Sequence, residues 1–67
     1  MKVVDARGLS CPEPIMLTMA ALKKGEDIKV LETEPNQKTN VEKYALSQKK
    51  LFKTTETEDG FEVEIKA

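Results

Sequence analysis

The single cysteine, Cys11, lies in residues 8–14, which have the sequence GLSCPEP and stand between an expected strand and an expected helix. Pro12 suits the first position of that helix, because its fixed φ matches the helical turn and its missing N–H would have no partner there. Pro14 also lacks an N–H, which leaves the amides of Glu13 and Ile15 among the early donors. The sulfur of Cys11 is therefore expected within about one turn of the positive end of the helix dipole.

This position favours a thiolate. A helix N-terminus stabilises a nearby anion by about 0.3–1 kcal/mol, and by up to about 2 kcal/mol when the site is partly buried. At about 1.36 kcal/mol per unit, this lowers the pKa of the Cys11 thiol from about 8.5 to roughly 7–8. The carboxylate of Glu13 opposes the effect if it turns towards the sulfur. An attacking thiol works best when its pKa is close to the ambient pH, so Cys11 is suited to sulfur–sulfur exchange.

Composition removes most other reactions. The chain has no histidine and one cysteine, so it cannot assemble a Cys–His or Ser–His pair, a zinc site or a CxxC motif. We expect no cofactor and no metal, and the second reactant must come from another molecule. A lone cysteine is commonly a small buried apolar residue, but Cys11 precedes the apolar pattern of the helix. A binding or regulatory module with a structural Cys11 remains the alternative, and a redox sensor is disfavoured because a resolving cysteine is missing.

Length and charge narrow the class of protein further. The 67 residues are enough for one domain, 1–67. A net charge of −1, 4% aromatic residues and the absence of tryptophan argue against direct binding of nucleic acid. The sequence has neither a membrane-spanning apolar run nor a signal peptide, and one cysteine suits a reducing compartment. We therefore expect a cytoplasmic protein without a membrane partner.

The expected elements have the order βαβαββ. Strands are predicted over residues 3–6, 28–33, 51–58 and 61–66, and helices over 12–24 and from Asn36 or Thr39 to about 49. Either Asn36 or Thr39, which begins an S/T-x-x-E capping box, could cap the second helix. The compact strand–helix–strand unit implies a right-handed crossover and parallel pairing. The predicted fold is an α/β (α+β) two-layer sandwich, with two helices on one face of a four-stranded mixed sheet.

Apolar spacing predicts which side chains are buried. The first helix is expected to bury Ile15, Met19 and Leu22, with Met16 and Ala20 beside them. The second is expected to bury a face that consists of Val41, Tyr44, Ala45 and Gln48, and Phe52 is also expected in the core. Asp59-Gly60 predicts a hairpin turn. A two-residue turn would pair Glu58 and Glu56 with Phe61 and Val63, whereas a bulged turn would place Thr57 and Thr55 there. We favour the bulged turn because it keeps carboxylates out of the core.

The pattern Asp5-x-x-Gly8-x-x-Cys11-Pro12-x-Pro14, followed by an amphipathic helix and βαββ, resembles the TusA/SirA-like sulfur-carrier family over essentially the whole chain. The resemblance implies that Cys11 holds sulfane sulfur as a persulfide, with Asp5, Gly8, Pro12, Glu13 and Pro14 as supporting motif residues. It implies a sulfurtransferase-type carrier rather than a stand-alone enzyme. Its partners would be a protein sulfur donor, of the cysteine desulfurase or rhodanese type, and a protein sulfur acceptor.

Members of this family serve tRNA thiolation, molybdenum-cofactor biosynthesis or sulfur oxidation, so the resemblance leaves the pathway open. Many of them open the second helix with a basic–acidic pair. Thr39 and Asn40 stand at those positions here. This departure concerns the choice of partner, because that end of the helix lies near the motif in the family's fold.

Overall fold

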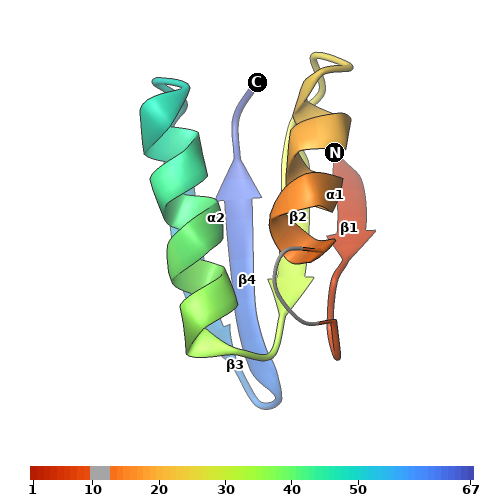
Figure 1. Ribbon diagram of the computed structural model, residues 1–67, viewed down its shortest axis with the longest axis vertical. Coiled ribbons are helices and arrows are strands. Elements are labelled where there is room, and N and C mark those ends of the chain that lie inside the picture. The colour runs from red at the N-terminus through yellow and green to blue at the C-terminus, as the bar shows by residue number, and fades with distance from the viewer. Residues whose placement is uncertain (10–12) are drawn as a thin grey trace.

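Two helices cover one face of a four-stranded sheet (Figure 1). The computed structural model describes residues 1–9 and 13–67. Its elements are β1 (Lys2–Asp5), α1 (Glu13–Leu22), β2 (Ile28–Glu32), α2 (Pro35–Ser47), β3 (Phe52–Thr57) and β4 (Gly60–Ile65). The strands lie in the order β1-β2-β4-β3; β1 and β2 are parallel, and the other two pairs are antiparallel. The predicted βαβαββ sandwich with a mixed sheet is confirmed.

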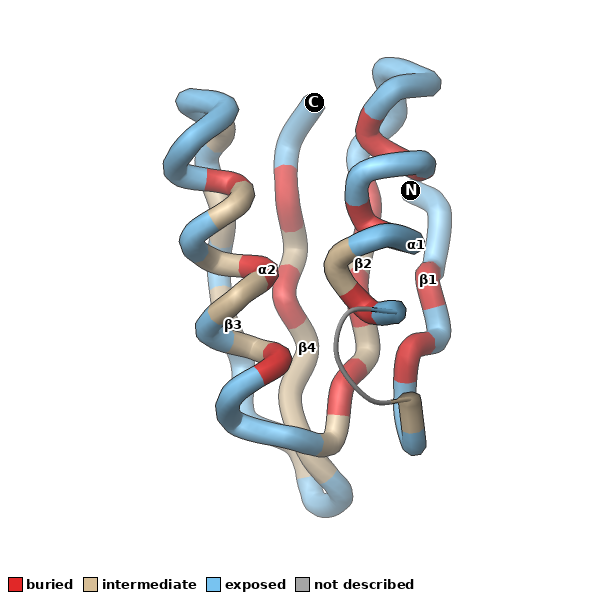
Figure 2. Tube along the Cα trace, viewed as in Figure 1, coloured by how far each residue is buried: buried red, intermediate tan, exposed pale blue. Residues whose placement is uncertain are grey.

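The core lies between the helices and the sheet, and buried residues alternate with less buried ones along β2 (Figure 2). Residues paired across strands share a face of the sheet, so the pairing defines rows of side chains beneath the helices. One row contains Ile28 and Ile65, and the next contains Val30 and Val63, all fully buried. The last row, where β2 ends, contains Glu32 opposite Phe61.

Helix α1 packs on the sheet with a different face from the one predicted. Its buried residues are Pro14, Thr18, Ala21 and Leu22. Met16 and Met19 are exposed and Ile15 is half-buried, so the prediction of a buried Ile15–Met19–Leu22 stripe was wrong except at Leu22. The buried face thus combines the small side chains of Thr18 and Ala21 with Leu22, whereas the methionines lie on the exposed face. The helix ends at Leu22 rather than at residue 24, in a turn closed by the Gly25 N–H, which donates to Leu22 O (3.0 Å).

Helix α2 begins earlier than either predicted cap. Glu34 is the N-cap, and Pro35 occupies the first helical position, where its fixed φ and missing N–H suit the helix start. Thr39 lies inside the helix and donates from Oγ1 to Pro35 O (3.1 Å). The buried residues are Gln37, Val41 and Ala45. Tyr44 and Phe52 are partly buried and pack against the core, whereas the predicted Gln48 is exposed.

The hairpin between β3 and β4 has a register that neither considered turn predicted. Thr57 pairs with Gly60, so Glu58 and Asp59 form the turn, and Glu56 lies opposite Phe61. The expectation that threonines face Phe61 was therefore wrong. Because β3 is an edge strand, the carboxylate of Glu56 reaches solvent from this face and needs no burial.

Within the described residues, neither helix is long and apolar enough to cross a membrane.

Candidate functional site

The chain that leads into the cysteine segment is fixed to the end of β2. Gly8 has a positive φ of 78°, a conformation that favours glycine. Its N–H donates to Thr33 Oγ1 (3.3 Å), and the Leu9 N–H donates to Ala6 O (3.3 Å). Leu9 packs against the core. Residues 10–12, which include the predicted Cys11 and Pro12, lie outside the described residues.

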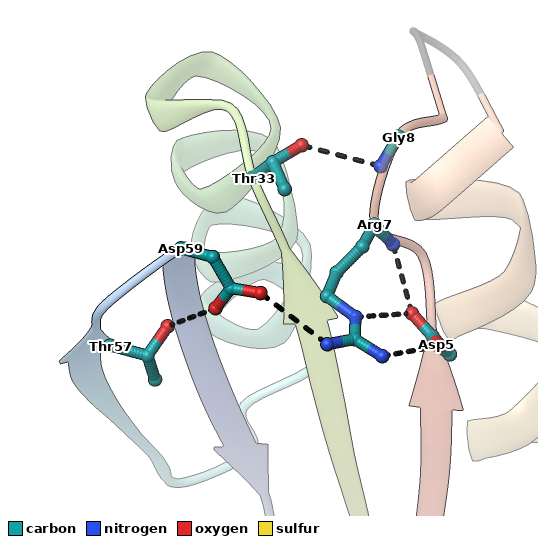
Figure 3. A network of polar contacts seen from close by, with 6 residues as sticks. All are labelled: Asp5, Arg7, Gly8, Thr33, Thr57 and Asp59. Carbon is teal, nitrogen blue, oxygen red and sulfur yellow. Dashed lines mark hydrogen bonds and ion pairs between the residues drawn. The ribbon is translucent and has the colours of Figure 1, made fainter.

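An ion pair stands beside this turn (Figure 3). Arg7 donates from Nε to Asp5 Oδ1 and from Nη2 to Asp5 Oδ2, both at 2.9 Å. Its Nη1 also lies 3.5 Å from Asp59 Oδ2, which links the end of β1 to the β3–β4 turn. Hydrogen bonds from the Arg7 side chain and backbone lower the pKa of Asp5 to about 2. In return, the hydrogen bonds to Asp5 raise the pKa of Arg7.

On the far side of the segment, α1 begins with Glu13 and Pro14. Glu13 is exposed in the first helical turn, whereas Pro14 is buried. The Pro14 carbonyl accepts a hydrogen bond from Thr18 Oγ1 (2.9 Å) inside the protein. Cys11 is thus two residues from a firmly packed helix start in one direction and three residues from an anchored glycine in the other.

Two surface hollows are lined by residues that precede or follow the segment in the chain. One, of about 260 Å³, is lined by Gly8 and Leu9, by Thr33 and Glu34 between β2 and α2, and by Asn36 and Gln37 in the first turn of α2. The other is apolar and is lined by Leu9, Glu13, Met16 and Leu17. Residues on both sides of the segment therefore border open, reachable surface.

The predicted supporting residues that the structure describes lie at one end of the molecule but in different environments. Asp5 binds Arg7, Gly8 holds the turn, and Glu13 and Pro14 open α1. The sequence reasoning missed Thr33 and Asp59, which hold Gly8 and Arg7. The three-residue spacing of Asp5 and Gly8 carried a signal for the turn, but only the sheet order brings Thr33 and Asp59 to it.

Comparison with solved structures identifies the class of fold. The crystal structure of a SirA-like protein from Desulfitobacterium hafniense superimposes with a TM-score of 0.91 at 28% identity, covering 97% of this chain and 95% of that one. A protein of Aquifex aeolicus described as a putative sulfur carrier protein is 31% identical over 62 residues. That match covers 88% of this chain and 32% of the Aquifex protein, so the chain spans about a third of the length of that relative.

The sequence pattern of the family described as sulfurtransferase TusA matches residues 2–67. The chain belongs to this family.

Proposed function

We propose that this protein is a sulfur carrier that holds sulfane sulfur as a persulfide on Cys11 and relays it between protein partners in a reducing cytoplasm. The observation that carries the proposal is the family match over residues 2–67, which includes the cysteine segment. The anchored turn at Gly8 and the start of α1 at Glu13 support it, because both flank Cys11 closely in the chain. Asp5, Gly8, Pro12, Glu13 and Pro14 are proposed to position this segment.

The proposed transfer needs only sulfur exchange. The Cys11 thiolate attacks the terminal sulfur of a donor persulfide, a new S–S bond forms to Cys11, and the donor's own thiolate leaves. In the second step an acceptor thiolate attacks the outer sulfur and Cys11 leaves as a thiolate. Sulfane sulfur moves without net oxidation or reduction, so neither step requires an external oxidant. A helix N-terminus near the sulfur would stabilise the loaded anion as well as the free thiolate.

Exposed apolar side chains support partners that are proteins. Met16, Leu17 and Met19 of α1 are 59%, 40% and 37% exposed. Met16 and Leu17 line the apolar hollow that reaches Leu9 and Glu13, beside the cysteine segment. Apolar surface of this kind is typical of a contact with another protein. We propose that a cysteine desulfurase or rhodanese-type donor and a thiol-bearing acceptor protein contact this end of the molecule.

The direct test is sulfur loading. The protein is incubated with a cysteine desulfurase and radiolabelled cysteine, and its intact mass is measured without reductant. We expect label on the protein and a mass gain of one sulfur atom, both lost in Cys11→Ser.

A matched control moves the thiol elsewhere. The double variant Cys11→Ser, Ser47→Cys carries one cysteine at an exposed position near the end of α2. We expect this thiol to load far more slowly than Cys11. Equal label on the two proteins, or none on the wild type, would reject the carrier and favour a binding module in which Cys11 is structural.

A further inference from the structure

Glu32, the last residue of β2, has a buried carboxyl group with no hydrogen-bond partner among the described residues. The residue is 1% exposed, and neither carboxyl oxygen has a hydrogen-bond partner among the described residues. Its side chain turns towards the helices, in the row that contains Phe61. Gln37, in the first turns of α2, is 6% exposed, and its Oε1 also has no partner in the described part of the chain. This end of the core therefore holds two polar groups in need of a proton or a donor.

The charges around Glu32 disfavour its ionised form. Within α2, Lys38 Nζ lies 3.6 Å from Glu42 Oε1. The same Nζ lies 5.4 Å from the centre of the Phe61 ring. Glu42 also accepts a hydrogen bond from Thr54 Oγ1. Burial first, and the nearby Glu42 carboxylate second, raise the pKa of Glu32 to about 7, against the weaker opposing effect of Lys38.

Other charged groups at this end are directed to solvent or to each other. Glu56 of β3 shares the row of Phe61 and Glu32 but is exposed, and Glu13 at the start of α1 is exposed too. Arg7, after β1, is held by Asp5 and Asp59. None of these groups forms an ion pair or hydrogen bond with Glu32 in the part of the chain that the structure describes.

Glu32 is connected through its neighbour Thr33 to the turn that precedes the cysteine segment. The next residue, Thr33, accepts the hydrogen bond from the Gly8 N–H, and Leu31 O accepts one from the Ala6 N–H (2.9 Å). The Glu32 carbonyl lies close to Gly60: a Cβ built on residue 60 would be 2.0 Å from Glu32 O. The Glu32 side chain and the Thr33 side chain that holds Gly8 therefore belong to adjacent residues at the end of β2, which lies between β1 and β4.

We propose that Glu32 is a protonation-dependent positioning residue: as a neutral acid it keeps the end of β2 and the start of α2 closed, and its ionisation loosens the Thr33–Gly8 anchor of the cysteine segment. The neutral acid can donate a hydrogen bond to an acceptor at this end of the core, whereas the anion requires water or a cation. The consequence for Cys11 rests on the proposed sulfur-carrier function, but the opening of the anchor does not.

The first test follows the anchor without sulfur chemistry. In Cys11→Ser, which removes the titration of the thiol, the backbone amide signals of Gly8, Thr33 and Gln37 are followed by NMR from about pH 5 to about pH 8.5, together with the Glu32 carboxyl carbon. We expect all four to change together with a midpoint near pH 7. Glu32→Gln should remove the transition at the three amides. Glu42→Gln should move it to lower pH, because the nearby like charge is gone.

The matched control is Glu62→Gln. Glu62 belongs to β4 and pairs with Leu31, so it lies on the opposite face of the sheet from Glu32. The transition should be unchanged in this variant. Gly8 and Thr33 amides that stay fixed while the Glu32 carboxyl titrates, or that move equally in Glu32→Gln, would overturn the proposal.

The second test joins the anchor to sulfur loading. The ratio of loading rates, wild type over Glu32→Gln, is expected to fall by roughly threefold or more from about pH 6 to about pH 8.5, because misplacement of a reacting group slows transfer. A constant ratio alongside a normal amide transition would reject the positioning role alone. A protein that loads at no pH would reject the carrier and leave the amide result standing.

Discussion

The two ends of the layer between the helices and the sheet are built from different residues. At the end where β4 finishes, Ile28 and Ile65 are fully buried and Phe52 packs against them. At the end where β2 finishes, the buried positions hold Glu32 and Gln37. Both carboxyl oxygens of Glu32 and the amide oxygen of Gln37 lack hydrogen-bond partners among the described residues. The apolar end supplies burial energy, whereas the polar end carries groups whose desolvation is unfavourable.

The apolar end therefore stabilises the fold, and the polar end lowers its stability. The polar end is the one to which Gly8 and the start of α1 attach the cysteine segment. Local violations of the packing rules are expected near functional positions and are offset by ordinary packing elsewhere. Substitutions at the two ends should therefore affect stability with different magnitudes and different dependence on pH.

The largest expected effect comes from the apolar end. Ile65→Ala removes a fully buried side chain that packs with Ile28. The loss should be about 2–5 kcal/mol, which is comparable with the roughly 3–5 kcal/mol expected for so small a domain. Circular dichroism during urea titration should therefore show a mostly unfolded variant. Val3→Ala, at a position 56% exposed, is the control and should remain within about 0.5 kcal/mol of wild type. Equal losses in the two variants would contradict the comparison.

The next effect tests how tightly β4 confines the end of β2. In Gly60→Ala, the new Cβ would lie 2.0 Å from Glu32 O and 2.9 Å from the Thr33 Cα. Both obstacles are backbone atoms, so the strands must separate, and we expect a loss of about 3 kcal/mol in unfolding free energy. Gly25→Ala is the matched control: its Cβ meets open space, and only its positive φ of 76° is strained, at about 1 kcal/mol. The ranking fails if Gly25→Ala is the more damaging substitution.

The polar end should give wild-type stability an unusual dependence on pH. The folded-state pKa of Glu32, about 7, lies above its ordinary value of 4.5, so the folded protein binds this proton more tightly than the unfolded chain. The resulting stabilisation is fully present below about pH 4.5 and is lost as the pH rises through 7. We expect the unfolding free energy to fall by about 3 kcal/mol across this window, at about 1.36 kcal/mol per pKa unit. Glu32→Gln should abolish this decline; a parallel decline in the variant would assign it to another group.

The fold could be predicted because it depends on patterns that are local in the sequence. Alternating apolar residues in Phe61, Val63 and Ile65, and turn residues such as Gly25, define the elements and their order. Which face α1 buries could not be predicted in the same way. Apolar periodicity favoured the methionines, but the helix buries Thr18 and Ala21 instead. Which face is buried depends on how the helix packs on the sheet, and helical spacing alone does not contain that information.

The sequence was enough to predict the segment that contains the candidate site, but not the residues from other strands that hold this segment. Gly8, Glu13 and Pro14 flank Cys11 in the sequence, so a local motif is enough to find them. Thr33 and Glu32 belong to this region only because β2 lies beside β1. Alternation along β2 places Glu32 on the same face as Ile28 and Val30, so the strand pattern did indicate its burial. The polar side chain concealed that signal, because an isolated glutamate is normally exposed.

The smallest effect concerns the ion pair beside the turn. Asp5 and Arg7 are both exposed, so their attraction is screened by solvent and salt, and Arg7→Gln should leave the urea midpoint at neutral pH almost unchanged. The pKa of the Asp5 carboxyl should instead rise from about 2 towards 3.8, as measured by NMR titration. Because the folded-state pKa is lowered in the wild type, this contribution is present above about pH 3.8 and disappears as the pH falls through 2.

Lys53→Gln, an exposed cation on β3, is the control and should not move the Asp5 titration. Since the pH window of Asp5 does not overlap that of Glu32, the two carboxyl groups can be separated in one protein. A large stability loss in Arg7→Gln would mean that the contact from Arg7 to Asp59, rather than the buried row beneath the helices, holds this end of the sheet together.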